Sequence, residues 1–189
     1  MKQAVLVAFG WSADHTSPIS QAILFMTRRG INPLARWAQW SHMFLVFEFD
    51  DGSRVIHEAL MSDGWREKPS IKLVNWKKKD PMRHLYTVKW LPIDQKNITL
   101  IYQASCAWLG AKSYARRQLL AFAIAESMLG RWLGLGIAPG PNEVICSEGA
   151  CRLVGSICPA WDLRAYADQP WDSVTPQGAY DRYLKLSSQ

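Results

Sequence analysis

The first half of the chain consists of short apolar runs separated by turn residues, which is the pattern of a β-sheet. Strands are predicted over residues 4–9, 43–49, 54–60, 71–75 and 85–91. Alternate residues from Met43 to Phe49 form one wholly apolar face, whereas His42, Phe44 and Val46 point to the other. Asp50-Asp51-Gly52-Ser53 separates the second strand from the third and predicts a β-hairpin.

Apolar residues at helical spacing are concentrated in the second half. An early helix is predicted from Pro18 to Met26, closed by Gly30, because proline suits the first turn of a helix. Later helices are predicted over residues 97–109, ended by Gly110, from a cap at Ser113 through Ile124, ended by Gly130, and from Cys146 onward. The last is indicated by apolar residues 4, 7, 8 and 11 positions after Cys146. A Gly/Pro-rich stretch, residues 130–141, precedes that helix, and the aromatic tail beyond Pro159 is expected to be irregular and to wrap around the body.

Strands followed by helices predict an α+β fold, an antiparallel sheet or half-barrel packed against helices. The 189 residues form one predicted domain, 1–189, and 49% hydrophobic residues suffice for a core. No apolar run approaches the roughly 18 residues that span a bilayer, and the run at 4–9 is too short for an export signal. We therefore expect a cytoplasmic protein without a transmembrane segment.

The net charge of +6 permits an anionic partner without requiring one. The densest basic run, residues 77–79, adjoins Asp80 and Pro81 and is interpreted as a solvated turn. The ten tryptophans are scattered along the chain and are interpreted as packing residues. No specific nucleic-acid partner is expected, and the oligomeric state stays open.

Among the four cysteines, Cys146 has the surroundings of a reactive thiol. The spacings of Cys106, Cys146, Cys151 and Cys158 match no common zinc pattern. Cys146 is predicted at the first turn of a helix, where unpaired N–H groups and the helix dipole favour a thiolate and help to stabilise an oxyanion. None of the other three is predicted at a helix start, so Cys146 is the candidate nucleophile.

A thiolate nucleophile needs a histidine as base and acid, and four are available. His15 lies in an early loop and His84 follows a basic turn, so both are interpreted as surface residues. His42 begins a strand and points away from the apolar face, which makes it the candidate base.

The residue that orients this imidazole depends on the register of the hairpin. A two-residue turn at Asp51-Gly52 places Glu58 on the opposite side of the sheet from His42 and favours His57. A three- or five-residue loop, or one bulge, places Glu58 on the same side as His42. Periodicity leaves both alternatives open.

Three short segments together resemble a known family. Residues 40–47 (WSHMFLVF), 55–59 (VIHEA) and 144–148 (VICSE) are similar to motifs of the circularly permuted NlpC-like hydrolases, the YiiX-like branch of the papain-like enzymes. In that family the histidine precedes the cysteine, as here. The resemblance implies a papain-like fold with a Cys146–His42–Glu58 triad, and residues 109–114 resemble the segment that supplies a tyrosine, here Tyr114, near the oxyanion site.

The function implied is that of a cysteine hydrolase of the peptidase or amidase type, acting through an acyl-enzyme without a metal or organic cofactor. The relatives suggest peptide or isopeptide amides, cell-wall peptides or acyl lipids as substrates, so a lipid or thioester acyl hydrolase or acyltransferase is an alternative. Two further alternatives are a zinc site at His42, Glu58 and Cys146, and a non-catalytic binding protein that keeps the fold. Residues 130–141 are either a gate for an acyl chain or an ordered loop.

Overall fold

The structure is a computed structural model that describes residues 2–26, 38–60, 62–69, 84–114, 143–164, 171 and 174–188. The predicted strand at 71–75, the predicted helix beyond residue 114 and the stretch 130–141 lie outside these ranges.

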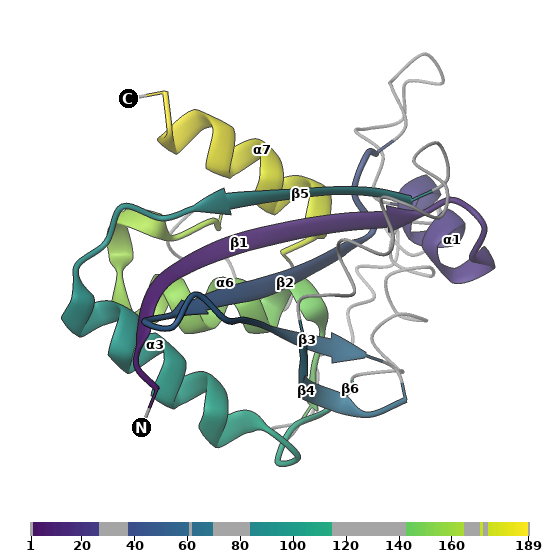
Figure 1. Ribbon diagram of the computed structural model, residues 1–189. Coiled ribbons are helices and arrows are strands. Elements are labelled where there is room, and N and C mark those ends of the chain that lie inside the picture. The colour runs from purple at the N-terminus through teal and green to yellow at the C-terminus, as the bar shows by residue number, and fades with distance from the viewer. Residues whose placement is uncertain are drawn as a thin grey trace.

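The described part of the chain has an α+β fold built on a five-stranded antiparallel sheet (Figure 1). The strand order is β4-β3-β2-β1-β5. The strands are β1 (Ala4–Asp14), β2 (His42–Phe49), β3 (Arg54–Leu60), β4 (Gly64–Pro69) and β5 (His84–Trp90). A parallel pair of two-residue strands, β6 (Ser113–Tyr114) and β7 (Glu143–Val144), leads directly to the helix that carries Cys146.

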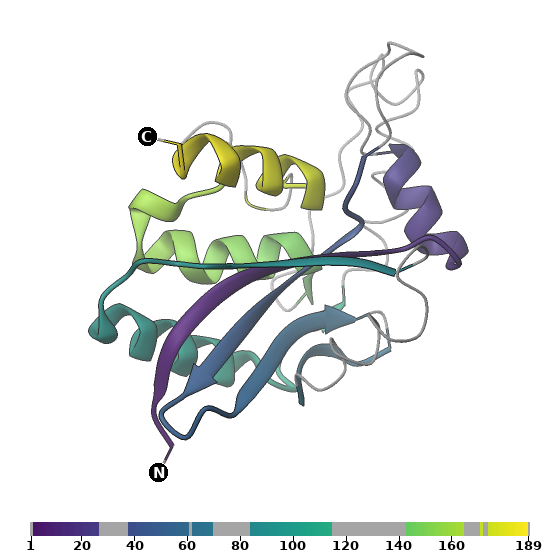
Figure 2. The ribbon, with the colours of Figure 1, turned by 45° about the horizontal axis from the view of Figure 1, so that its top comes forward.

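Helices α3, α6 and α7 lie together on one side of the sheet, whereas α1 lies at the far end of β1 (Figure 2). Their bounds are α1 (Pro18–Met26), α3 (Gln95–Trp108), α6 (Cys146–Ile157) and α7 (Pro176–Leu186), and a short 3₁₀ helix spans Pro159–Trp161. No helix in the described ranges is both long enough and apolar enough to cross a membrane.

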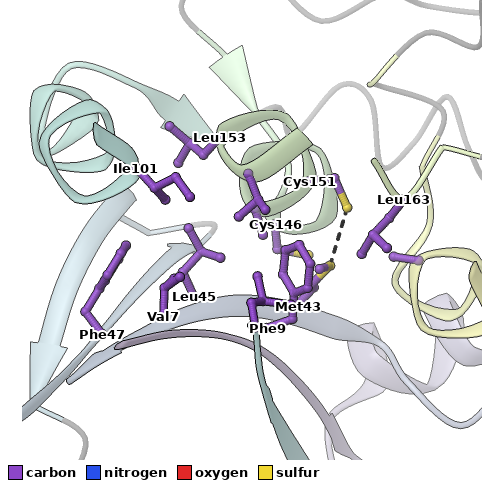
Figure 3. Packing of buried hydrophobic residues seen from close by; sticks show 14 of the residues in the cluster. Val7, Phe9, Met43, Leu45, Phe47, Ile101, Cys146, Cys151, Leu153 and Leu163 are labelled. Carbon is purple, nitrogen blue, oxygen red and sulfur yellow. Dashed lines mark hydrogen bonds between the residues drawn. The ribbon is translucent and has the colours of Figure 1, made fainter. Parts of the chain in front are cut away.

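The core lies between the sheet and α6 (Figure 3). Met43, Leu45 and Phe47 of β2 are fully buried on the side that α6 covers. From α6, the apolar stripe contributes Ala150, Leu153 and Val154, all buried as the spacing predicts. The helix is therefore fixed to β2 along its length, and its first residue is held at one end of the sheet.

The β2–β3 hairpin has a three-residue loop, which decides its register. Val46 pairs with Ile56, and the Phe49 N–H donates to the Ser53 carbonyl at 2.9 Å. Gly52 closes the loop at a φ of 76°, the left-handed conformation that glycine adopts readily. Glu58, two residues beyond Ile56, consequently lies on the same side of the sheet as Val46 and His42.

Two expectations about the elements are wrong, and one strand was not predicted. The tail contains a regular helix, α7, which begins after Thr175, whose hydroxyl accepts from the Gly178 N–H at 3.0 Å. Ser113 lies in β6 and therefore does not cap a helix. Strand β4 was not predicted, because its polar and charged residues obscure the apolar alternation that marks a half-buried strand.

Two glycines with positive φ provide a matched test of backbone strain. Alanine at Gly52 would meet nothing within 4 Å, whereas a Cβ at Gly64 would lie 2.0 Å from the Lys112 carbonyl oxygen. We expect Gly52→Ala to lower the free energy of unfolding by about 1 kcal/mol, through the left-handed φ alone. Gly64→Ala should cost at least about 2 kcal/mol, because β4 must also move away from residue 112. Urea unfolding of both variants measures the difference, and equal losses would contradict this contact.

Candidate active site

The start of α6 fixes the position of Cys146. The preceding residue, Ile145, is extended, and its N–H donates to the Glu148 carboxylate at 3.4 Å. The Ser147 hydroxyl donates to the Val174 carbonyl at 2.5 Å, which attaches the first turn to the chain that leads into α7. Cys146 is thus the first residue of α6, as predicted, and it is 4% exposed.

His42 is the first residue of β2, and the residues before it are held by hydrogen bonds. The Gln177 side chain of α7 accepts from the N–H groups of Gln39 at 2.6 Å and Trp40 at 3.3 Å. The Ser41 N–H donates to the Ser12 carbonyl at 3.1 Å. These bonds tie the entry of β2 to α7 and to β1, so the imidazole projects from a rigid support.

The imidazole of His42 lies between the thiol of Cys146 and the carboxylate of Glu58. Its Nε2 is 2.9 Å from Glu58 Oε2, and the thiol of Cys146 lies near enough to the same ring to raise the His42 pKa. Because Glu58 occupies Nε2, Nδ1 is the nitrogen left for the thiol. The structure therefore brings together the three residues that the sequence singled out, in the order thiol, imidazole and carboxylate.

The carboxylate of Glu58 is itself paired with cations from β4. Lys68 Nζ lies 2.6 Å from Oε1, and Arg66 Nε lies 3.9 Å from the same oxygen. The Glu58 side chain is 5% exposed. Although burial alone would raise its pKa, the hydrogen bonds and charges of His42 and Lys68 lower the Glu58 pKa to about 2. Glu58 is thus a carboxylate throughout the neutral range.

The electrostatics of the pair favour a thiolate and an imidazolium. Burial by itself would lower the pKa of His42, yet the thiolate charge and the hydrogen bonds from Cys146 and Glu58 raise it to about 10. Burial opposes ionisation of Cys146 as well, but the charge and hydrogen bond of His42, with the N–H groups of Met43 and Ser147, hold its pKa below the usual range. Both shifts favour the thiolate–imidazolium ion pair over the neutral pair.

The other three thiols have the opposite character. Burial raises the pKa of Cys151 well above its usual value, and it also raises the pKa of Cys106 and of Cys158. Cys151 Sγ contacts the Met43 sulfur at 3.7 Å inside the core (Figure 3). Cys146 is consequently the one cysteine of the four whose surroundings favour the thiolate.

His57 lies on the opposite side of the sheet from His42 and is fully buried. Its Nδ1 lies 2.6 Å from Ser105 Oγ and its Nε2 lies 3.0 Å from Glu67 Oε2. The Ser105 hydroxyl also accepts from the Trp65 indole at 3.1 Å and has no exposed surface. The chain of bonds joins α3 to β3 and β4 in the interior, so His57 is a satisfied core histidine and does not orient His42.

The remaining candidates are placed only in part. His15 lies in a partly exposed turn, consistent with its interpretation as a surface residue. The backbone of Tyr114 belongs to β6, next to β7 and the start of α6. The side chains of Tyr114 and His84 lie outside the described part of the structure, so the oxyanion role of Tyr114 stays a prediction.

The zinc alternative does not suit this geometry. Glu58 Oε2 lies 2.9 Å from His42 Nε2, so these two groups bond to each other, whereas the ligands of one ion bond to the metal. In the described ranges, no group of three His, Cys, Asp or Glu side chains is arranged to hold a metal ion. The arrangement is instead suited to passing a proton between the thiol and the ring.

Two supporting residues were missed by the sequence analysis. Lys68 lies in the unpredicted strand β4, and Gln177 lies in the unpredicted helix α7. A Thr-Pro pair at 175–176 is a helix-start signal that would have revealed α7. No local signal indicates that Lys68 meets Glu58, since the contact depends on the pairing of β3 with β4.

Comparison of the chain with models of known families, with curated proteins and with solved structures gives no match.

Proposed function

We propose that the protein is a papain-like thiol hydrolase that cleaves an amide or ester bond through an acyl-enzyme on Cys146. The observation that carries the proposal is the His42 ring held between a thiol of lowered pKa and a buried carboxylate. The similarity of three segments to the permuted NlpC-like hydrolases supports the same assignment.

In the proposed reaction, the Cys146 thiolate attacks the carbonyl carbon and a C–S bond forms. The oxygen becomes an oxyanion beside the first N–H groups of α6, which have no acceptor within the helix. When the tetrahedral intermediate collapses, the bond to the amine or alcohol breaks and His42 gives its proton to that leaving group. Water then attacks the thioester while His42 takes one of its protons, and the acid leaves as the thiolate is restored.

Glu58 has a supporting part in this sequence. Its Oε2 accepts from His42 Nε2 and stabilises the imidazolium present before the attack and again after the water has reacted. The nucleophile is already ionised in the resting state, as in other thiol–imidazole pairs, so the imidazolium acts first as an acid.

The test is to identify which cysteine forms a covalent acyl adduct. The intact protein is mixed with a p-nitrophenyl ester, quenched in acid within seconds and mapped by peptide mass spectrometry. We expect the acyl group on the peptide that carries Cys146, together with a burst of nitrophenol before steady turnover. Cys151→Ser serves as the matched control, because it removes a thiol from the same helix.

Two results would overturn the proposal. One is equal modification of all four thiols by iodoacetamide at neutral pH, which would favour a binding protein that keeps the fold. The other is turnover that survives in Cys146→Ala at the wild-type rate.

A further inference from the structure

The two oxygens of the Glu58 carboxylate are divided between two cations. Oε2 lies 2.9 Å from His42 Nε2, whereas Oε1 lies 2.6 Å from Lys68 Nζ. The last torsion of a glutamate side chain is broad, so one hydrogen bond leaves the carboxylate room to turn. The contact at Oε1 therefore restricts the carboxylate to the orientation in which Oε2 faces the imidazole.

Lys68 is brought to this point by the pairing of β3 with β4. Ile56 pairs with Lys68 and Glu58 pairs with Arg66, so the three polar side chains lie on the same side of the sheet as His42. The Lys68 side chain is 15% exposed, little for a residue that is normally solvated. A buried ammonium loses part of its hydration free energy, and the ion pair with Glu58 offsets that cost.

Arg66 is the natural comparison, because it is a cation on the same strand. Its Nε stays 3.9 Å from Glu58 Oε1, while its guanidinium is paired closely with Asp63. Arg66 is also more exposed than Lys68, at 28% against 15%. Lys68 is consequently the cation that binds the carboxylate directly.

We infer that Lys68 is a positioning residue of the active site, whose ammonium fixes Glu58 Oε1 so that Oε2 stays on His42 Nε2. The inference rests on the proposed function of Cys146. Along the row Cys146, His42, Glu58 and Lys68 the charges alternate as −, +, −, + in the ion-paired state that the site favours. Each group stabilises the ionised form of its neighbour, and Lys68 is the last charge of the row.

The row ends in a pocket of about 390 Å³ at the end of the sheet. His42, Glu58 and Lys68 line it together with residues of β1 and α1, whereas Cys146 is not among its described lining residues. Shortening Lys68 would thus leave the carboxylate open to solvent at a place that a small amine can enter.

The experiment measures the rate of Cys146 alkylation by iodoacetamide against pH in four proteins: wild type, Lys68→Ala, Lys68→Arg and Arg66→Ala. For Lys68→Ala we expect about a tenfold lower rate at pH 6 and a thiol ionisation that moves up by about one pH unit. Lys68→Arg should recover most of the rate, since a guanidinium also binds a carboxylate. Arg66→Ala should change the rate less than threefold.

Chemical rescue separates positioning from a purely structural role. Ethylammonium at about 50 mM should restore at least half of the rate lost in Lys68→Ala, because it supplies the missing N–H donors and charge. Tetramethylammonium has the charge without a donor and should restore little. Thermal unfolding of each variant, with and without amine, shows whether the fold is intact.

The outcomes are distinguishable from those that test the proposed function. A wild-type Cys146 that reacts no faster than the other thiols removes the proposed function itself. A fast wild-type Cys146 with an identical pH profile in folded Lys68→Ala overturns the inference about Lys68 alone. Equal rescue by ethylammonium and tetramethylammonium would also overturn the inference, because the recovered rate would then reflect ionic strength.

Discussion

His42→Ala is expected to lower the rate of Cys146 alkylation at pH 6 by roughly 100-fold. An ordinary thiol with a pKa of about 8.5 is only about 0.3% ionised at pH 6. Without His42, burial dominates and the Cys146 pKa rises above its usual range, since the thiol is 4% exposed. The intrinsic reactivity of a more basic thiolate is higher, which offsets part of the loss.

The shape of the pH profile distinguishes this explanation from a general loss of structure. In the wild type the rate should fall less steeply than in His42→Ala as the pH falls from 8 to 6, because the lowered Cys146 pKa favours the thiolate. In His42→Ala the rate should fall about tenfold for each pH unit. His15→Ala, the same substitution in a partly exposed turn, should follow the wild type. A flat profile in His42→Ala would contradict the ion pair.

Hydrolysis should depend on pH differently from alkylation. His42 must be protonated to act as the acid, and its pKa is raised to about 10. Above that pH the imidazole is neutral while the thiol stays ionised, so turnover should decline although alkylation remains fast. Parallel decline of both rates would indicate unfolding instead.

The positions of Cys146 and His42 in their elements are local features, which is why the sequence indicated them. A Gly/Pro stretch followed by apolar residues at helical spacing predicts that Cys146 begins a helix, and the structure has α6 starting there. The strand that starts at residue 42 or 43 is equally clear from alternation, and β3 has the predicted bounds. The thiol–imidazole contact itself joins segments far apart in the chain and follows only from the packing of α6 on β2.

Whether Glu58 or His57 lies beside the His42 imidazole depends on whether the β2–β3 loop has two residues or three. The periodicity of the strands does not determine this length. Asp51-Gly52 is compatible with a two-residue turn, and only the left-handed Gly52 at the third loop position places Glu58 beside His42. The contact of Lys68 with Glu58 could not be predicted for another reason. Strand β4 is charged because Arg66 and Lys68 face Glu58 while Glu67 pairs with His57 on the other side, and this composition conceals it from any search for apolar alternation.

Glu58→Gln is expected to lower the free energy of unfolding at pH 7 by about 3 to 5 kcal/mol, because it leaves Lys68 without its buried counter-charge and removes one of the two anions beside His42. The amide keeps the size of the side chain, so the loss reports on charge rather than on packing. Glu48→Gln is the matched control, because Glu48 pairs with Arg54 at the surface, where the Arg54 side chain is 50% exposed. Loss of this ion pair should cost at most about 1 kcal/mol.

The double variant Glu58→Gln, Lys68→Met separates stability from reactivity. Removing the lysine takes away a buried cation that has lost its partner, so the double variant should be more stable than Glu58→Gln alone. It should not regain fast alkylation of Cys146, because His42 still lacks the carboxylate. If the stability loss of the double variant equals the sum of the losses in Glu58→Gln and Lys68→Met, then Glu58 and Lys68 are not coupled.

The pH dependence of the Glu58 effect has a definite sign. The Glu58 pKa falls from an ordinary 4.5 to about 2 in the folded protein, so the carboxylate binds its proton more weakly when folded. Its contribution is therefore complete above pH 4.5 and is lost as the pH falls towards 2, a difference of about 3 kcal/mol. Urea unfolding of the wild type and Glu58→Gln between pH 7 and pH 3 should show the two stabilities converging. Curves that stay parallel down to pH 3 would mean that the charge of Glu58 contributes nothing, and the pairing with His42 and Lys68 would then be geometric only.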